Sequence, residues 1–480
     1  MKYLLNGILV CISLCHANGQ KWVEKTYTYE SKPNITYGTA INFAGGIDTL
    51  KLDLFLPKCD DPTHDSKRPL MLWFHGGSFL AGNKEDASIQ YLCKEFAKRG
   101  YVTASVQYRL GFVADDNLWQ CNYPNYSCFF ASDQAEWMRA YYRAVQDGKG
   151  ALRYLINRSD TYRIDPQNVF ISGESAGALL SLGIGLLDTE NERPDQTRAL
   201  SPAPKPNAGT LNCSYNVSKP LQNDMIERPD LGSIDGDIEP TNITFTIKGI
   251  GNIYGAIPFD LLKNIPSNKI KPAIYSFHQP CDIIVPIDSN YIYWGLNWCF
   301  TNGYNCHAIQ NYNFKLYGSR TISDWNEKKG YGYDIHNEFT NVIFPYQFLF
   351  GTGSCLDQVN NPCHAYDNRN LREGNLAHFF ASKITTNPYC DPNFVSATDD
   401  ENLPKINVFP NPVSDILNIE ANVELYAYRL NTMYGNTASQ QFDLKTTKIQ
   451  INITNLKPGV YILDIQYKNR KRWFSKIVVP

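Results

Sequence analysis

The sequence predicts a doubly wound, mostly parallel α/β sheet followed by a small C-terminal β-sandwich. From about Leu50 to Ile384, apolar segments of strand length alternate with helical segments, as in a parallel sheet covered by helices on both faces. Residues 70–74 (LMLWF) form a continuous apolar run, which is typical of a strand buried on both sides. Near residue 404 the pattern changes to short alternating strands without helices between them.

The elements of the larger domain follow in order along the chain. The predicted strands are short and mostly apolar: 70–74, 101–108, 168–172, 250–255, 273–277 and 313–317. The predicted helices lie between some of them: 89–98, 134–157 and 176–187. Two segments interrupt this rhythm, one rich in aromatic residues at about 115–130 and one rich in Pro, Asn and Asp at about 191–242. Such long loops are either functional lids or poorly ordered excursions, and the sequence leaves both open.

The smaller domain begins after a change in composition. Asn, Pro and Asp at 386–403 indicate a linker, and strands are expected at 416–420, 424–430, 448–453, 460–467 and 473–479. We therefore predict an N-terminal signal over 1–19, an α/β domain over 20–385, the linker, and a β-sandwich over 404–480.

The N-terminus has the features of a signal peptide. Lys2 supplies the positive charge, Tyr3–Cys15 is a short apolar stretch, and cleavage is expected after Ala17 or Gly19. The stretch is too short to span a bilayer, and no later segment is apolar enough to serve as a transmembrane anchor. The sequence therefore predicts export.

Cysteine usage agrees with export. Of 13 Cys, two leave with the signal, so 13 − 2 leaves 11 in an oxidising compartment. Close spacing suggests three disulfides: Cys121–Cys128, Cys299–Cys306 and Cys355–Cys363. An odd count leaves at least one thiol free or intermolecular. The C-x-x-C pairs of structural zinc sites are missing, so no metal site is predicted.

The charge balance excludes one class of partner. The formal net charge is −2, with 43% hydrophobic and 19% charged residues. Neither sign dominates a long stretch, so the sequence offers no electrostatic basis for binding nucleic acid or an anionic membrane.

A nucleophile elbow is the strongest chemical motif. Residues 173–177 (GESAG) fit the pattern G-x-S-x-G, directly after the predicted strand 168–172 and before a helix of small residues. This strand-turn-helix setting lifts a serine oxygen above the sheet edge. Ser175 is therefore the candidate nucleophile.

A candidate oxyanion hole follows the strand 70–74. A tetrahedral intermediate needs hydrogen-bond donors that are fixed before its charge develops. The backbone N–H groups of Gly76, Gly77 and Ala176 are the candidate donors, since glycine lets the backbone approach a substrate closely. We expect a structural role for the neighbouring His75.

These motifs together resemble the carboxylesterase/lipase branch of the α/β-hydrolase superfamily. The resemblance rests on residues 75–77 (HGG), 108–111 (YRLG) and 173–177 (GESAG), and it runs from about Leu50 to Ile384. It implies a doubly wound sheet, a Ser-Asp-His triad, ester hydrolysis and no cofactor.

The acid of the triad is expected after a strand downstream of the serine. Residues 278–286 (HQPCDIIVP) resemble the family loop in which an Asp precedes an apolar pair and Val-Pro, which favours Asp282 over Asp288 and Asp260. Gln279 stands where the family usually has Gly.

The base is expected beyond Asp282, where His307, His336, His364 and His378 are available. His364 lies in a loop before a helix, as the terminal histidine of the family does, although Cys363 replaces the usual Gly. His378 is the main competitor. The apolar residues around it repeat at helical spacing and leave His378 on a side that should meet solvent.

The C-terminal segment resembles the type IX secretion sorting domain of Bacteroidetes. Three ordered motifs carry this resemblance: 409–412 (FPNP), 455–461 (NLKPGVY) and 476–480 (KIVVP). It implies passage across the outer membrane with the type IX machinery as partner, followed by removal of the domain or surface attachment. A carbohydrate-binding sandwich is the alternative, but these strands do not provide the row of exposed aromatics that it would need.

The sequence thus predicts a secreted or surface-attached serine carboxylic-ester hydrolase. One alternative is a serine peptidase of the prolyl-oligopeptidase type, which usually has Gly where Ala178 stands and carries preceding propeller repeats that this chain lacks. The other is a catalytically dead adhesion module on the same fold. Acetyl groups on polysaccharide, feruloyl esters and lipids all remain open as substrates, because fold does not choose the substrate.

Overall fold

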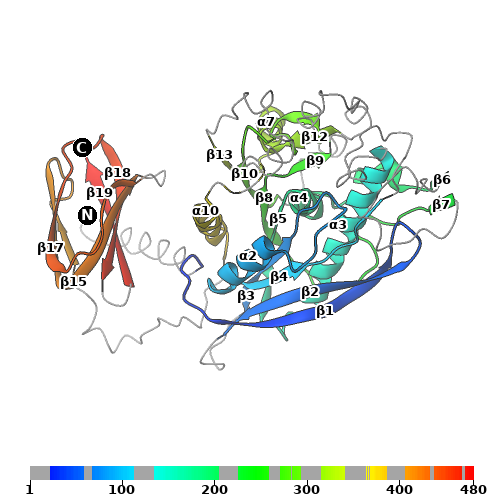
Figure 1. The fold of residues 1–480 in the computed structure, drawn as a ribbon, viewed down its shortest axis with the longest axis horizontal. Coiled ribbons are helices and arrows are strands. Elements are labelled where there is room, and N and C mark those ends of the chain that lie inside the picture. Colours follow the sequence, from blue (N-terminus) through cyan, green and yellow to red (C-terminus); the bar gives the residue numbers. More distant parts are fainter. Residues whose placement is uncertain are drawn as a thin grey trace, which may run out of the picture. The chain divides into compact units, whose positions relative to one another are not determined.

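The computed structural model of the chain divides into two units, Met1–Asn393 and Phe394–Pro480 (Figure 1). The described residues are 22–58, 67–112, 134–204, 225–258, 271–282, 284–292, 315–340, 364, 366, 368–385, 406–432, 437–467 and 471–480. The predicted signal peptide, the aromatic insertion at 115–130, the three predicted disulfides and the predicted linker lie outside them. The predicted domain boundaries therefore stay a proposal.

The larger unit is built on an eight-stranded sheet with the order β1-β2-β4-β3-β5-β8-β10-β13. The strands are β1 Tyr29–Ile41, β2 Ile47–Pro57, β3 Arg68–Phe74, β4 Val102–Val106, β5 Ile164–Glu174, β8 Ile247–Ile253, β10 Ala273–His278 and β13 Ile335–Phe339. Neighbours pair in parallel from β4 to β13, whereas β1 pairs antiparallel with β2, and β2 pairs antiparallel with β4. The predicted mostly parallel sheet is therefore confirmed.

Helices cover both faces of this sheet, as predicted. They are α2 Ala87–Ala97, α3 Gln134–Ile156, α4 Ala176–Leu186, α7 Ser319–Lys329 and α10 Arg369–Ala381. The strand β3 shows why two layers form, because all seven of its residues are buried and successive side chains point to opposite faces. Two hydrophobic cores result, one on each face of the sheet.

 Met71 and Trp73 pack with α2 and α10, whereas Leu72 and Phe74 pack with α3 and α4.

One predicted strand takes a different place from the one its position in the sequence suggested. The strand predicted at 313–317 exists as β12, Lys315–Gly318, but it pairs with β9, Ala256–Pro258, and β11, Ser289–Tyr291, in a separate three-stranded sheet. The last strand of the main sheet is instead β13, which contains His336. The antiparallel hairpin β1–β2, which extends one edge of the sheet, was not predicted.

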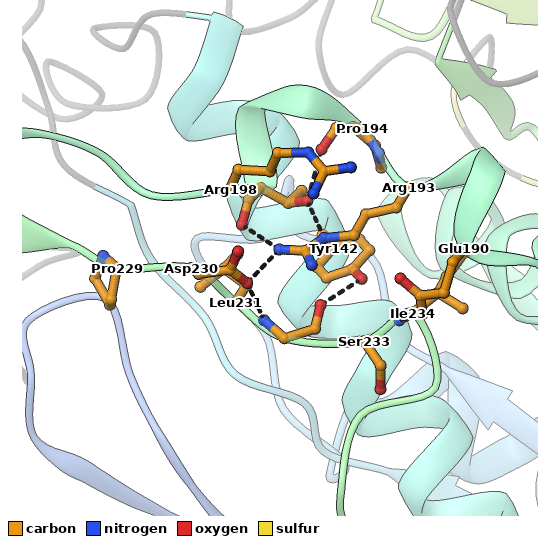
Figure 2. Close-up of polar contacts among 12 residues, drawn as sticks. Tyr142, Glu190, Arg193, Pro194, Arg198, Pro229, Asp230, Leu231, Ser233 and Ile234 are labelled. Carbon is orange, nitrogen blue, oxygen red and sulfur yellow. Dashed lines mark hydrogen bonds and ion pairs between the residues drawn. The ribbon is translucent and has the colours of Figure 1, made fainter.

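The described parts of the second insertion are anchored on α3. They contain the short elements η2 Glu190–Glu192, η3 Asp195–Thr197, β6 Leu200–Pro204 and β7 Met225–Arg228. Figure 2 shows Tyr142 of α3 beside this segment, with its hydroxyl donating to the carbonyl of Gly232 at 2.9 Å. Arg193 forms an ion pair with Asp230 across the segment. These parts of the insertion are therefore a folded layer on the helix.

The smaller unit is a six-stranded antiparallel domain with its own core. Its strands are β14 Ile406–Phe409, β15 Ile416–Thr432, β16 Thr437–Gln441, β17 Thr446–Asn452, β18 Gly459–Tyr467 and β19 Lys471–Val479. The two strands predicted at 416–420 and 424–430 are one long strand, β15, with an irregularity between Glu420 and Leu425. The first half of β15 pairs with β14 and β17 and the second half with β16 and β18, so one strand serves two sets of neighbours.

In the described ranges of both units, no helix combines the length and the apolar character needed to cross a bilayer.

Candidate active site

The turn between β5 and α4 holds Ser175 in a strained conformation. Its φ of 56° and ψ of −121° lie in a region that residues with a side chain rarely adopt. A Cβ on Gly173 would lie 2.3 Å from the carbonyl carbon of Gly177, and a Cβ on Gly177 would lie 2.1 Å from the carbonyl oxygen of Phe74. Steric crowding therefore requires both glycines of the motif, and the turn presents Ser175 between the ends of the strands.

Two distant side chains meet Ser175 and form a continuous relay. Nε2 of His364 lies 2.9 Å from Oγ of Ser175, and Nδ1 of His364 lies 2.7 Å from Oδ2 of Asp282. The carboxylate of Asp282 can only accept a hydrogen bond, so Nδ1 of His364 carries a proton and donates it in a hydrogen bond to Asp282. Nε2 of His364 then accepts the hydrogen bond from the hydroxyl of Ser175. The arrangement can remove a proton from Ser175.

Asp282 is fully buried and accepts several hydrogen bonds. Its Oδ1 accepts from the backbone N–H groups of Ile284 and Val285, each at 2.9 Å. Burial raises the pKa of this carboxyl, but His364 and His278 outweigh that effect, and the pKa is lowered overall. The donors therefore keep Asp282 ionised in a site where an unpaired carboxylate would be costly.

His278 is a support for this site that the sequence analysis did not single out. Its Nε2 lies 3.0 Å from the carbonyl oxygen of Val285 and 3.3 Å from Oδ2 of Asp282, and both partners can only accept. Nε2 is therefore the protonated nitrogen, and Nδ1 of the neutral ring accepts from Ser319 at 2.9 Å. His278 stands four residues before Asp282, and that spacing was the available signal.

The loop that carries Asp282 is closed by two further contacts. Gln279, in the position where the family usually has Gly, is buried, and its carbonyl accepts from the N–H of Asp282 at 3.0 Å. Cys281 is disulfide-bonded, although none of the three predicted pairs contains it. Cys93, which is buried in α2, is a free thiol, in line with the odd number of cysteines.

The candidate oxyanion donors lie beside Ser175. A Cβ on Gly76 would be 3.2 Å from the Cβ of Ser175, so this loop packs directly against the elbow. Gly77 has a φ of 111°, and a Cβ there would be 2.1 Å from the carbonyl oxygen of Ala81. Ala176 is the first residue of α4, where no intrahelical acceptor exists. Within the described ranges, the N–H groups of these three residues donate to no other protein group.

His75 makes the contacts of a structural residue. Its ring is buried, stacks on Tyr108 with the centroids 4.4 Å apart, and its Nδ1 lies 2.7 Å from the carbonyl oxygen of Gly76. Burial lowers the pKa of His75 to about 4, so the ring is neutral at physiological pH. It contributes to the shape of the loop and does not contact Ser175.

The competing acids and bases lie elsewhere or outside the described residues. Asp288 is exposed and pairs with Arg320 at 2.9 Å. His336, in β13, lies 3.6 Å from Glu338, and His378 is exposed on α10. Asp260 and His307 belong to the part that the structure does not describe.

Tyr254 contacts His364 and is hydrogen-bonded to Glu174, and sequence reasoning missed this arrangement. The ring of Tyr254 lies 4.9 Å from the ring of His364, and the hydroxyl of Tyr254 is hydrogen-bonded to Glu174. Oε1 of Glu174 also accepts from Ser88 at 2.5 Å. Burial raises the pKa of both Glu174 and Tyr254. Because these residues come from separate parts of the chain, no local sequence pattern indicates that Tyr254 contacts His364 and Glu174.

Family comparisons agree with this fold. Residues 15–115 match the carboxylesterase family, residues 126–270 match the BD-FAE family, and residues 407–480 match the secretion system C-terminal sorting domain. These matches confirm the predicted resemblance of the larger domain to the carboxylesterase branch of the α/β-hydrolase superfamily, and that of the C-terminal segment to a type IX sorting domain.

Individual relatives match only in part. Gut esterase 1 of Caenorhabditis elegans is 26% identical over 152 residues, which is 32% of this chain and 23% of the relative. Carboxylesterase 5A of Homo sapiens is 31% identical over 132 residues, 28% of this chain and 19% of the relative. The chain thus matches less than a quarter of the length of these two proteins.

Solved structures that are similar to this chain include a truncated form of carbohydrate esterase from gut microbiota. It is 15% identical, with a TM-score of 0.38 over 75% of this chain and 98% of that one. A thermophilic esterase of Thermogutta terrifontis is 16% identical, with a TM-score of 0.36 over 78% of this chain and 95% of that one.

The crowding at the elbow predicts a large effect of one added methyl group. Gly177→Ala should destabilise the larger unit by at least about 3 kcal/mol, the upper end of the usual cost of overpacking, because the clash is with backbone that cannot rotate away. Urea unfolding followed by tryptophan fluorescence measures this. The matched control is Gly374→Ala in α10, where an added Cβ meets nothing within 4 Å and helix propensity favours Ala by about 1 kcal/mol. Equal stability of Gly177→Ala and the unmodified chain would contradict the steric account.

Proposed function

We propose that this protein is a secreted serine carboxylic-ester hydrolase that acts through Ser175, His364 and Asp282. The observation that carries the proposal is the relay from Asp282 through His364 to Ser175, with distances of 2.7 Å and 2.9 Å. The carboxylesterase-family match of residues 15–115 supports an ester as substrate.

In the first half of the proposed reaction, Oγ of Ser175 attacks the ester carbonyl while Nε2 of His364 takes its proton. The negative charge that develops on the carbonyl oxygen is stabilised by the N–H groups of Gly76, Gly77 and Ala176. His364 then donates the proton to the leaving alcohol, and an acyl-enzyme forms on Ser175.

In the second half, a water molecule replaces the alcohol. His364 takes a proton from the water, whose oxygen attacks the acyl carbon, and returns that proton to Oγ of Ser175 as the carboxylic acid leaves. Asp282 holds the imidazole and stabilises its positively charged form in both halves. No cofactor is required by these steps.

Two alternatives can be compared with this proposal. The adhesion module is a different class of protein, and the serine peptidase is a hydrolase with a different substrate. The relay and the unoccupied backbone donors argue against a catalytically dead adhesion module. A serine peptidase of the prolyl-oligopeptidase type would use the same relay, but Ala178 follows the motif where that family usually has Gly. The relatives named as esterases favour ester hydrolysis.

The sorting domain implies type IX secretion to the cell surface or the outside. We propose that the signal peptide at 1–19 directs the first step across the inner membrane. The type IX machinery then recognises the domain at 404–480, after which the domain is removed or serves in attachment. The α/β domain, proposed to span 20–385, would act outside the cell.

Replacement of the nucleophile tests the central step. Ser175→Ala should fold and should lose ester turnover by about 10⁴-fold or more, because no other group can form the acyl-enzyme. A chromogenic-ester assay and labelling with a fluorophosphonate measure this, and a panel of ester and peptide substrates separates esterase from peptidase. Labelling of the unmodified chain at Ser175 excludes the dead module, and a Ser175→Ala variant that keeps most of its turnover rules out Ser175.

His364 and its main competitor as the base, His378, should behave in opposite ways. His364→Ala should cost about as much turnover as Ser175→Ala, because members of a relay act as a unit. His378→Ala is the matched control and should cost little, since His378 is exposed on α10. Steady-state kinetics of both variants, with circular dichroism to check folding, decides between them. The reverse order of effects would remove His364 from the mechanism.

Removal of the smaller unit should separate catalysis from delivery. A chain that ends near Leu403 should keep its ester turnover in lysates but remain inside the outer membrane of a host with type IX secretion. Activity in the periplasmic, surface and medium fractions measures this. Normal surface delivery of the shortened chain would refute the sorting role.

A further inference from the structure

The backbone conformation of Tyr254 is a feature of the fold that the proposed reaction steps do not use. Tyr254 directly follows the last residue of β8, and its φ of 42° lies in the left-handed region that residues with a side chain rarely adopt. Strained residues of this kind persist only where their surroundings hold them, and they cluster at active sites. A strained tyrosine whose ring contacts His364 therefore indicates a functional role.

The backbone around Tyr254 is fixed on two sides. Its N–H donates to the carbonyl of Phe277 in β10 at 2.6 Å. The next residue, Gly255, has no space for a side chain, because a Cβ there would lie 2.4 Å from the Cβ of Ala178 in α4. The end of β10 and the start of α4 thus hold the chain in the conformation that places the ring of Tyr254 against His364.

The side chain of Tyr254 is fixed as well. It is only 6% exposed, and the edge contacts of its ring have centroid distances of 6.4 Å to Phe277 and 5.8 Å to Tyr366. Its hydroxyl donates to Glu174, which also accepts from Ser88 at 2.5 Å. The ring cannot shift without breaking a buried hydrogen bond, which is costly.

The imidazole of His364 needs a contact of this kind. Hydrogen bonds at its two nitrogens, to Asp282 at 2.7 Å and to Ser175 at 2.9 Å, fix the ring along one line but leave it free to turn about that line. The side chain of His364 is 16% exposed, so the protein does not enclose it completely. The ring of Tyr254, with its centroid 4.9 Å from that of His364, is close enough to restrict this rotation.

We propose that Tyr254 is a positioning residue for His364. Its ring holds the imidazole in the orientation that joins Asp282 to Ser175, and its hydrogen bond to Glu174 holds the ring. The inference rests on the proposed function, because it concerns the proton transfers of His364. His364 moves a proton in both halves of the reaction, so a loss of its orientation slows both.

Steady-state hydrolysis of p-nitrophenyl acetate by the full chain tests the proposal. Tyr254→Leu removes the ring contact and should lower kcat by about 10- to 100-fold, with KM changed by less than about threefold. Tyr254→Phe keeps the ring, which Phe277 and Tyr366 still hold, and should retain kcat within about threefold of the unmodified chain.

Tyr275 provides the matched control, because it has the same kinds of partner away from the relay. It is buried in β10, its ring stacks on His336 with the centroids 5.6 Å apart, and its hydroxyl donates to Glu338 at 2.7 Å. Tyr275→Leu should lower the melting temperature about as much as Tyr254→Leu, yet keep kcat within about threefold of the unmodified chain. Thermal melts followed by circular dichroism compare the stabilities.

Three kinetic results would overturn the proposal: an unchanged kcat in folded Tyr254→Leu, an equal loss of kcat in Tyr254→Phe, or an equal loss in Tyr275→Leu. If Tyr254→Leu does not fold, Tyr254→Met takes its place with the same expected results, because the flexible side chain of Met fills irregular spaces.

Crystal structures of the unmodified chain and of Tyr254→Leu separate this proposal from the proposed function. In the variant, the distance from Nε2 of His364 to Oγ of Ser175 should exceed the hydrogen-bond range of about 3.2 Å. An imidazole that stays in place would overturn the positioning role. If the unmodified chain neither hydrolyses the ester nor reacts with a fluorophosphonate, the proposed function has failed, and the two structures still decide whether Tyr254 positions His364.

Discussion

The close approach of Gly177 to the carbonyl of Phe74 is the constraint on which the site depends. It joins the start of α4 to the end of β3, and it leaves no space for a side chain. The N–H of Ser175 donates to the carbonyl of Ile253 at 3.0 Å, so the elbow is tied to β8 as well. Three parallel strands therefore end at one point, and the loop after β3 lies against Ser175. The strained backbone of Ser175 persists because these neighbours leave it no alternative.

The second half of the site depends on the hydrogen bonds that stabilise the buried carboxylate of Asp282. Asp282 lies at 0% exposure, and its two oxygens accept from two backbone N–H groups and from His364, with His278 at 3.3 Å. His278 is held in turn by Ser319 of α7, and Ser319 accepts from Asn252 of β8 at 3.0 Å. The orientation of the acid is thus linked to the sheet that positions Ser175.

The second insertion modifies the molecule at a different place. Its described parts pack on α3, and α3 in turn contacts α4, β1 and β5. Tyr142, Arg139 and Gln146 of α3 all donate to carbonyls of the insertion. A variable loop on a rigid scaffold can acquire a binding surface without altering the chemistry of the scaffold.

The sequence by itself determined the features that arise from short-range sterics. The apolar run 70–74 predicted a doubly covered strand, and G-x-S-x-G predicted the elbow, because in both cases neighbouring residues impose the geometry. The choice among four histidines was different, since His364 is 189 residues from Ser175 and meets it only through the path of the chain. Tyr254 carries no local signal that identifies its partners, and His278 offered only its spacing of four residues before Asp282. The place of β12 in a separate sheet and the union of two predicted strands in β15 were likewise decided by pairing with distant strands. Contacts between distant segments depend on sheet order, register and loop path, which only the tertiary structure specifies.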